Sequence, residues 1–150
     1  MNLHKGGIMV RTQTDWTVNR IVAFIIGIVF LILGILGLIL HTTSGSIFGF
    51  QVDLVHNLVH LVTGILGIGA AYTGRSRLFN QVFGIIYLLL GILGLFPGLY
   101  YDGRLLGIMH VNSADNLLHL IVGVVASAVG FFVREPDTGT TTDRDSLARP

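Results

Sequence analysis

The sequence predicts an all-α integral membrane protein: a four-helix bundle made of two tandem helical hairpins with the same orientation. Three observations predict this fold. Hydrophobic residues make up 52% of the 150-residue chain and charged residues only 11%, whereas soluble domains carry about 25% charged residues. Long apolar segments, of a length that crosses a bilayer, alternate with short polar ones. Two motifs also occur twice, once in each half of the chain.

The apolar segments define a transmembrane domain. We expect it to span 18–133, with helices at about 18–40, 54–72, 78–96 and 114–133. The first helix includes 20 consecutive uncharged residues, Ile21 to Leu40, too long for the apolar part of a signal peptide and sufficient to cross a bilayer. The polar connections at 41–50 and 97–109 are expected to be loops.

Local signals mark several helix ends. Asp53 is placed to cap the second helix, because its side chain accepts hydrogen bonds from the free N–H groups of a first turn. Gly74 suits the end of the same helix, since glycine adopts the left-handed conformation that commonly follows a helix. Asn112 or Ser113 is expected to cap the fourth helix.

The distribution of basic residues predicts the orientation. Four spans bring both termini to one side, and that side carries eight of the nine Lys and Arg residues, while the other carries only Arg104. Basic residues favour the cytoplasmic side. We therefore expect a multi-pass protein of the cell inner (plasma) membrane. Residues 1–17 would be a cytoplasmic N-terminal segment and 134–150 a disordered cytoplasmic tail.

An internal repeat relates the two halves. GIVFLILGILGL recurs as GIIYLLLGILGL, and HNLVHLVTG matches DNLLHLIVG. The paired glycines are Gly27, Gly34 and Gly37 with Gly84, Gly91 and Gly94, and the second motif pairs Asn57, His60 and Gly64 with Asn116, His119 and Gly123. Small residues let membrane helices pack closely, so we expect the glycine faces to pack either within one chain or between copies.

Polar residues gather on one face of the second and fourth helices. Asn57, His60, Asn116 and His119 should form a buried cluster near the outer face, because unpaired polar groups in hydrocarbon cost several kcal/mol. Neighbouring residues would support this cluster: His56, Asp53, Asp115 and Asn112.

Three roles fit this cluster. The amides and imidazoles could fix the register between helices, a structural or interaction role, which we favour. Alternatively His56, His60, Asp115 and His119 could bind a metal, or His60 and His119 could flank a haem iron. A third role is a shallow pocket for a small amphiphile, such as a lipid headgroup or a quinone-like molecule.

Other functions find little support in the sequence. The chain has no cysteine, and its net charge of +1 gives no reason to expect a nucleic-acid partner. Nucleophile-elbow, phosphate-loop and HExxH motifs are absent from the sequence, so we assign no catalytic residue and rank catalysis last. The expected partners are the lipid bilayer and either another copy of the chain or a different membrane protein.

The two glycine-rich helices, each followed by an Asn-x-x-His-Leu motif, resemble an uncharacterised bacterial membrane family catalogued as domain of unknown function 4383. The similarity covers about Asn19 to Phe132. It implies a four-helix integral membrane protein and supplies no substrate, cofactor or catalytic residue. The first half has Asp53 where the second has Asn112, so the repeated site is not strictly symmetric.

Overall fold

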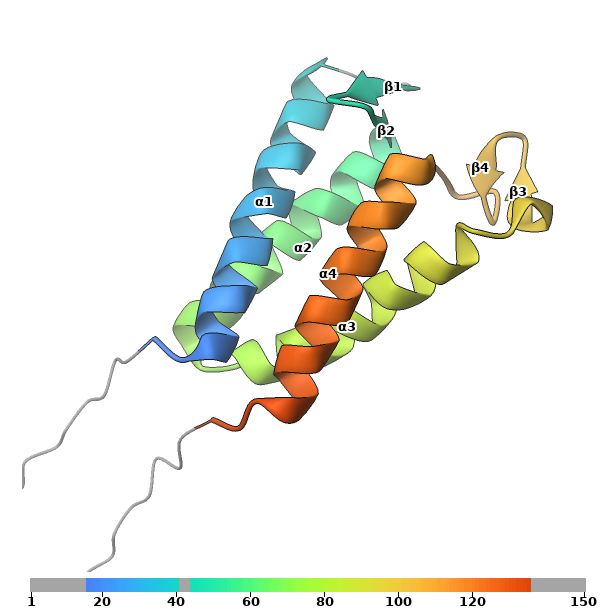
Figure 1. The fold of residues 1–150 in the computed structure, drawn as a ribbon. Helices are drawn as coiled ribbons and strands as arrows, with labels where there is room; N and C mark the ends of the chain where they lie inside the picture. The colour runs from blue at the N-terminus through green and yellow to red at the C-terminus, as the bar shows by residue number, and fades with distance from the viewer. Residues whose placement is uncertain (1–15, 41–43, 136–150) are drawn as a thin grey trace, which may run out of the picture.

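The computed structural model describes residues 16–40 and 44–135 (Figure 1). Their long helices are α1 (Val18–Leu40), α2 (Leu54–Thr73), α3 (Ser76–Leu93) and α4 (Ser113–Phe132). All of these are long and apolar enough to cross a bilayer. The predicted four-helix membrane fold is therefore confirmed. The predicted N-terminal segment and tail lie almost wholly outside the described residues.

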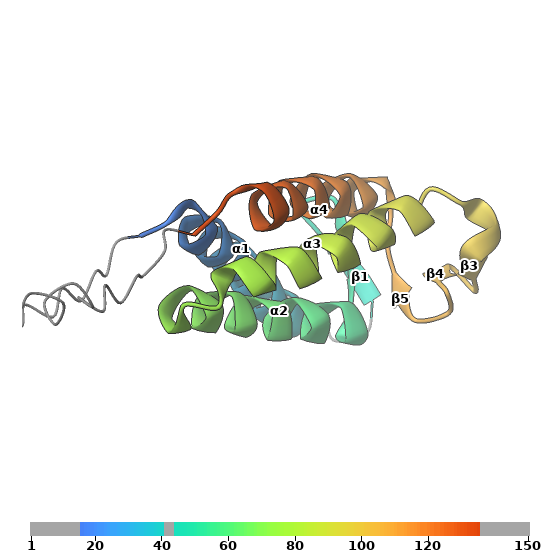
Figure 2. The same ribbon diagram turned by 90° about the horizontal axis from the view of Figure 1, so that it is seen from below.

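The helices form two hairpins, α1 with α2 and α3 with α4. Both ends of the described chain lie at one end of the bundle, here called the terminal end, and the strands lie at the opposite loop end (Figure 1). Helix α3 also runs beside α2 (Figure 2). In the middle of the bundle, Phe30 of α1 meets Tyr87 of α3 with ring centroids 4.7 Å apart. Because these two residues are equivalent in the repeat, a twofold axis that relates the two hairpins would pass between them.

The predicted caps are present. Asp53 accepts a hydrogen bond from the backbone N–H of His56, Gly74 ends α2 in the left-handed conformation, and Asn112 begins α4. Helix α3 differs from the prediction, since it begins two residues earlier and stops three residues earlier. The early stop has a local cause: Pro97 disfavours a helical conformation for Phe96, which is extended.

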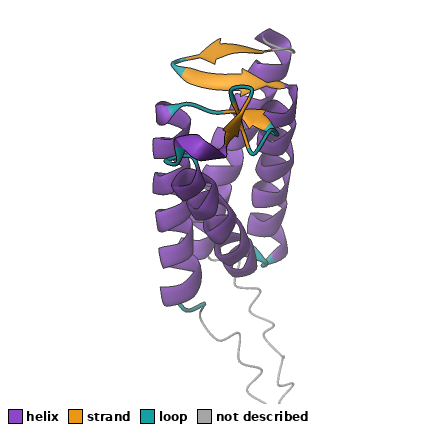
Figure 3. Cartoon of the chain, turned by 90° about the vertical axis from the view of Figure 1, so that its right-hand side faces the viewer, coloured by secondary structure: helices purple, strands orange, loops and turns teal. Residues whose placement is uncertain are grey.

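The connections predicted to be loops contain strands. Residues 44–53 form a hairpin of β1 (Ser44–Ile47) and β2 (Phe50–Asp53). Residues 97–110 form η1 (Pro97–Leu99) and a small sheet of β3 (Tyr100–Tyr101), β4 (Arg104–Leu105) and β5 (Met109–His110). The prediction of plain loops was thus wrong. These strands cover the loop end of the bundle (Figure 3), and β2 contacts β5.

Glycines let the helices of each hairpin touch through their backbones. A methyl group at Gly34 of α1 would lie 2.6 Å from the backbone nitrogen of Leu61, and one at Gly64 of α2 would lie 2.5 Å from that of Leu31. The second hairpin repeats this close approach at the equivalent Gly91. Real side chains do not tolerate such distances, so these glycine faces are used within the chain rather than left for another copy.

This packing predicts a position-dependent response to alanine. Gly64→Ala should lower the free energy of unfolding by about 1–3 kcal/mol, because the new methyl group overpacks the α1–α2 contact. Gly69→Ala on the same helix is the matched control, since a methyl group there meets nothing within 4 Å. Thermal unfolding in detergent measures both. Equal midpoints for the two variants would contradict the close packing of α1 and α2.

Candidate metal centre

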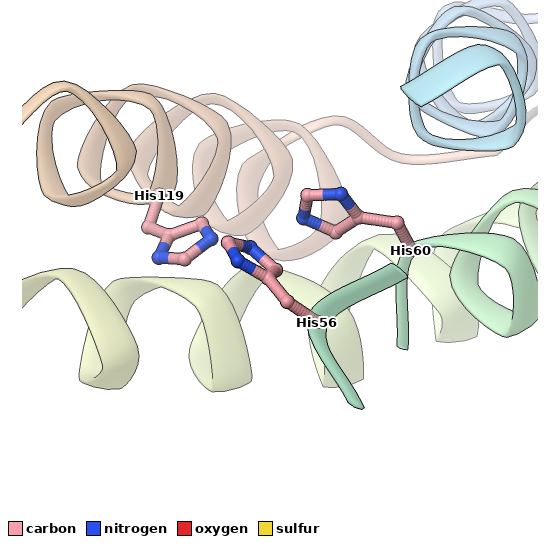
Figure 4. Close-up of side chains that lie close together, drawn as sticks. All are labelled: His56, His60 and His119. Carbon is pink, nitrogen blue, oxygen red and sulfur yellow. The ribbon is translucent and has the colours of Figure 1, made fainter. Parts of the chain in front are cut away.

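Three buried imidazoles converge in the loop half of the bundle. His56 and His60 come from successive turns of α2, and His119 comes from α4 (Figure 4). Each side chain is at most 3% exposed. One nitrogen from each ring lies within 4.8 Å of the others. His60 and His119, equivalent in the repeat, have ring centroids 6.3 Å apart, and His56 lies 4.3 Å from His60 and 5.8 Å from His119.

The hydrogen bonds of His56 fix which of its nitrogens is available. Its Nδ1 lies 3.1 Å from the backbone oxygen of His110. Because a carbonyl oxygen only accepts, Nδ1 carries the proton and donates. Nε2 therefore holds a free lone pair, and it is buried without a hydrogen-bond partner among the described residues. Metal-binding histidines are commonly oriented by such a bond from the other ring nitrogen.

The other two imidazoles have fewer hydrogen bonds than His56. Within the described part of the chain, both ring nitrogens of His60 and Nδ1 of His119 are buried without a hydrogen-bond partner. Aromatic rings pack against these histidines: Phe30 lies 4.7 Å from His60, and Tyr87 lies 5.3 Å from His119, between ring centroids. Tyr87 is 1% exposed and its hydroxyl pairs with Thr63 at 2.9 Å. The imidazoles are thus enclosed by apolar surface.

The two asparagines face the glycine-rich helices instead. The Asn116 side chain donates to the backbone oxygen of Gly94 at 2.7 Å. It also packs on Gly94 so tightly that a methyl group there would overlap its amide. Asn57 packs on Gly37 in the equivalent way. Among the four residues expected to share one cluster, only His60 and His119 therefore face the central site, while the asparagines join the helices within each hairpin.

Asp115 binds backbone groups in this structure. Its Oδ2 accepts hydrogen bonds from the backbone N–H of Asn112 at 2.8 Å and of Gln51 at 3.0 Å. The first bond completes a capping box at the start of α4. The second ties α4 to β2 in the other half of the chain. Asp115 is therefore not among the converging ligand atoms, although it interacts electrostatically with His56.

Asp53 makes the corresponding link from the first half to the second. Its Oδ2 accepts from the backbone N–H of His110 at 2.8 Å and from the His110 ring at 3.0 Å. Gln51 and His110 are 59 positions apart, the offset that also relates His60 to His119. No role of His110 was expected from its residue type alone, and the shared offset is the sequence feature that pairs its backbone with that of Gln51.

The environment of Asp53 favours its ionised form. Burial raises the pKa of its carboxyl, but hydrogen bonds from the His56 and His110 backbones and from the His110 ring outweigh that effect. Its pKa therefore lies below the ordinary value of 3.8. The carboxylate stays charged at neutral pH and interacts electrostatically with His56.

A family model described as "Domain of unknown function (DUF4383)" matches residues 20–132. The chain belongs to this family. The match covers α2, α3 and α4, all but the first two residues of α1, and each histidine of the centre. It agrees with the resemblance seen in the sequence motifs. No curated protein and no solved structure matches the chain. The family description names no activity, so any function has to come from the geometry of the site.

The depressed pKa of Asp53 makes stability depend on pH. The stabilisation from the ionised carboxylate is fully present above the unfolded pKa of 3.8, and it is lost as the pH falls through the lower folded pKa. Asp53→Asn keeps the N-cap but should lower the free energy of unfolding by about 1.5–3 kcal/mol at pH 7. The difference in unfolding free energy between the variant and the unsubstituted protein should shrink below pH 3.8.

Thermal midpoints of both proteins between pH 7 and pH 3 measure this effect. Asp102→Asn, in an exposed turn, is the control and should change the midpoint little. A difference between Asp53→Asn and the unsubstituted protein that stays constant, or widens, as the solution becomes acidic would refute the assignment.

Proposed function

We propose that this membrane protein binds one divalent transition-metal ion through His56, His60 and His119. One observation carries the proposal: the three buried imidazoles converge with four ring nitrogens that lack a hydrogen-bond partner among the described residues. A metal ion would use the lone pairs that the surrounding side chains leave unused.

Energetics favour this role over a purely structural one. A buried polar atom without a partner costs about 1–3 kcal/mol. If the cluster only joined helices, its nitrogens should be hydrogen-bonded to a neighbouring helix, as the side-chain nitrogen of Asn116 is to the Gly94 backbone at the end of α3. Instead, the hydrogen bond in this cluster is made by His56, through the nitrogen that faces β5, while four ring nitrogens are buried without a partner among the described residues. A cation would remove this cost at all three rings at once.

The ligand set indicates the class of metal. Neutral imidazoles suit Zn²⁺, Cu²⁺, Ni²⁺, Fe²⁺ and Co²⁺, whereas Mg²⁺ and Ca²⁺ prefer oxygen ligands. Zn–N bonds of about 2.0–2.1 Å place tetrahedral nitrogens about 3.3 Å apart. The three ring nitrogens, now within 4.8 Å of one another, would approach to this distance by small side-chain rotations. The carboxylates of Asp53 and Asp115, both of which interact electrostatically with His56, would offset the charge of the ion.

A haem or an amphiphile fits less well. His56 lies beside both His60 and His119, where a flat macrocycle would have to pass. Phe30 and Tyr87 pack against His60 and His119 from the middle of the bundle and are at most 1% exposed. The imidazoles are themselves at most 3% exposed, which suits a small ion better than a large ligand. We therefore propose a metal ion alone.

We also propose an orientation of the bundle in the membrane. With the excess of basic residues on the terminal side facing the cytoplasm, the loop end faces outward. His60 lies about seven residues into α2, which is roughly 10 Å along the helix axis. The metal would thus lie in the outer half of the membrane, close to the strands that cover the loop end.

Metal titration tests the binding site. Metal-free protein in detergent should take up one Co²⁺ per chain, with the visible absorption of a four-coordinate ion, and Zn²⁺ should displace it. At 100 times its dissociation constant, Zn²⁺ should stabilise the fold by about 2.7 kcal/mol. His60→Asn and His119→Asn should each weaken binding by at least about 100-fold, because even residues that only orient ligands change affinity by 10–100-fold.

His110→Gln is the matched control, because it removes an imidazole outside the centre while leaving the backbone oxygen that accepts from His56. It should retain one Co²⁺ per chain. If the unsubstituted protein takes up no metal, and the histidine variants only lower its stability, then the cluster is structural and metal binding is refuted.

Cysteine labelling tests the orientation, and the chain lends itself to this because it contains no cysteine. In intact cells, a membrane-impermeant maleimide should label Asp102→Cys in the loop-end sheet. It should label Arg134→Cys, at the terminal end, only after the cells are broken. The opposite labelling pattern would place the termini outside.

A further inference from the structure

An apolar groove runs between α2 and α3 on the bilayer-facing side of the bundle. It consists of two hollows of about 410 and 460 Å³. Both hollows include Phe83 in their lining, so they adjoin. The hollow nearer the terminal end is lined by apolar side chains, among them Ile65, Leu66, Leu78 and Val82.

The terminal-end hollow is close to the length of one lipid leaflet. Along α2 it extends from Ile65 to Thr73, which is about 12 Å at 1.5 Å per residue, and Arg75 lies in the turn just beyond. Half of a hydrocarbon core of about 30 Å is of similar length. A lipid chain lying in this hollow would therefore end near the bilayer centre and bring its headgroup to Arg75.

Two cationic side chains lie where that headgroup would be. Arg75 lines the hollow and is exposed. The Arg20 guanidinium lies beside the adjoining turn, since its Nη2 would be 3.6 Å from a methyl group at Gly74. Among residues 16–40 and 44–135, neither arginine forms a salt bridge with a carboxylate. By contrast, Arg77 is engaged, because it donates to the backbone oxygen of Gly130.

We propose that this groove binds an anionic phospholipid of the leaflet on the terminal side. One acyl chain lies along α2 and α3, and the phosphate pairs with Arg75 and Arg20. Cationic side chains at the membrane surface attract anionic lipid headgroups, and the adjoining apolar hollow distinguishes a lipid from a free phosphate ion.

A second copy of the chain suits the groove less well. All copies share one orientation in the membrane, so docking along this face would bring their arginines together, and like charges repel. An acyl chain is also a narrower occupant than a helix, whose diameter with side chains is about 10–12 Å.

Native mass spectrometry of the full chain tests the proposal. Protein in detergent is supplied with equal amounts of dioleoyl phosphatidylglycerol and dioleoyl phosphatidylcholine, and the lipid retained per chain is counted. Phosphatidylglycerol should be retained preferentially. Arg75→Gln should reduce that preference by about fivefold, and Arg104→Gln, at the loop end, should not change it.

A second variant tests the acyl-chain part of the site. Gly69 lines the hollow, and a methyl group there meets nothing within 4 Å. Gly69→Leu should therefore fill the groove without disturbing the helix contacts and abolish retention of the lipid, while the thermal midpoint is kept. Equal retention of the two lipids, or unchanged retention in both variants, overturns the proposal. So does a lipid-free dimer that Gly69→Leu disrupts, which would make a second copy the occupant.

Discussion

The hydrocarbon core of a membrane contains no water, so each polar group inside it needs a partner from the chain or from a bound ligand. At the terminal end of the bundle, side-chain amide nitrogens meet this requirement, although the Asn80 Oδ1 is buried without a hydrogen-bond partner among the described residues. Asn80 donates to the backbone and side-chain oxygens of Asn19, and Asn19 donates to the backbone oxygen of Val133. These bonds join α1 and α3 to the end of α4. Each amide nitrogen here has a partner in the protein.

The imidazole cluster departs from this pattern, which is why it stands out as a site. Packing alone does not require three histidines at the centre of the loop half, since Phe30 and Tyr87 form the equivalent central contact one layer below with apolar rings. Replacing such rings with imidazoles costs stability unless a ligand is bound. At the loop end, the hydrogen bond to the His110 backbone orients the His56 ring. There the carboxylates of Asp53 and Asp115 would offset the positive charge of a bound ion, because both interact electrostatically with His56.

The duplication explains why the cluster contains three imidazoles. His60 and His119 are equivalent and meet across the axis, but His56 corresponds to Asp115. In the second half that position completes the capping box of α4 and binds the backbone of Gln51. In the first half, the capping residue Asp53, the counterpart of Asn112, itself binds the backbone N–H of His110 in the other half. Position 56 is therefore not needed for such a link, and His56 turns its ring inward. One local difference at a helix start therefore converts a symmetric pair into a three-nitrogen site.

The sequence predicted the helices, their caps and the repeat, because each leaves a local signal: an apolar length, a capping side chain, or a motif at a fixed offset. It did not predict the strand hairpins, since Phe48–Gly49 is not one of the usual turn pairs. It also grouped Asn57 with His60 on one broad helix face. Only the arrangement of the neighbouring helices decides that Asn57 meets α1 while His60 meets the centre.

The central claim is that the two hairpins bring three imidazoles to one metal ion. X-ray absorption at the metal edge of the protein purified from its own membranes tests this claim most directly. The account predicts one metal per chain, with three imidazole nitrogens at about 2.0–2.1 Å if the metal is zinc. A coordination shell without imidazole, or protein that carries no metal even when it is purified without chelators, would contradict it.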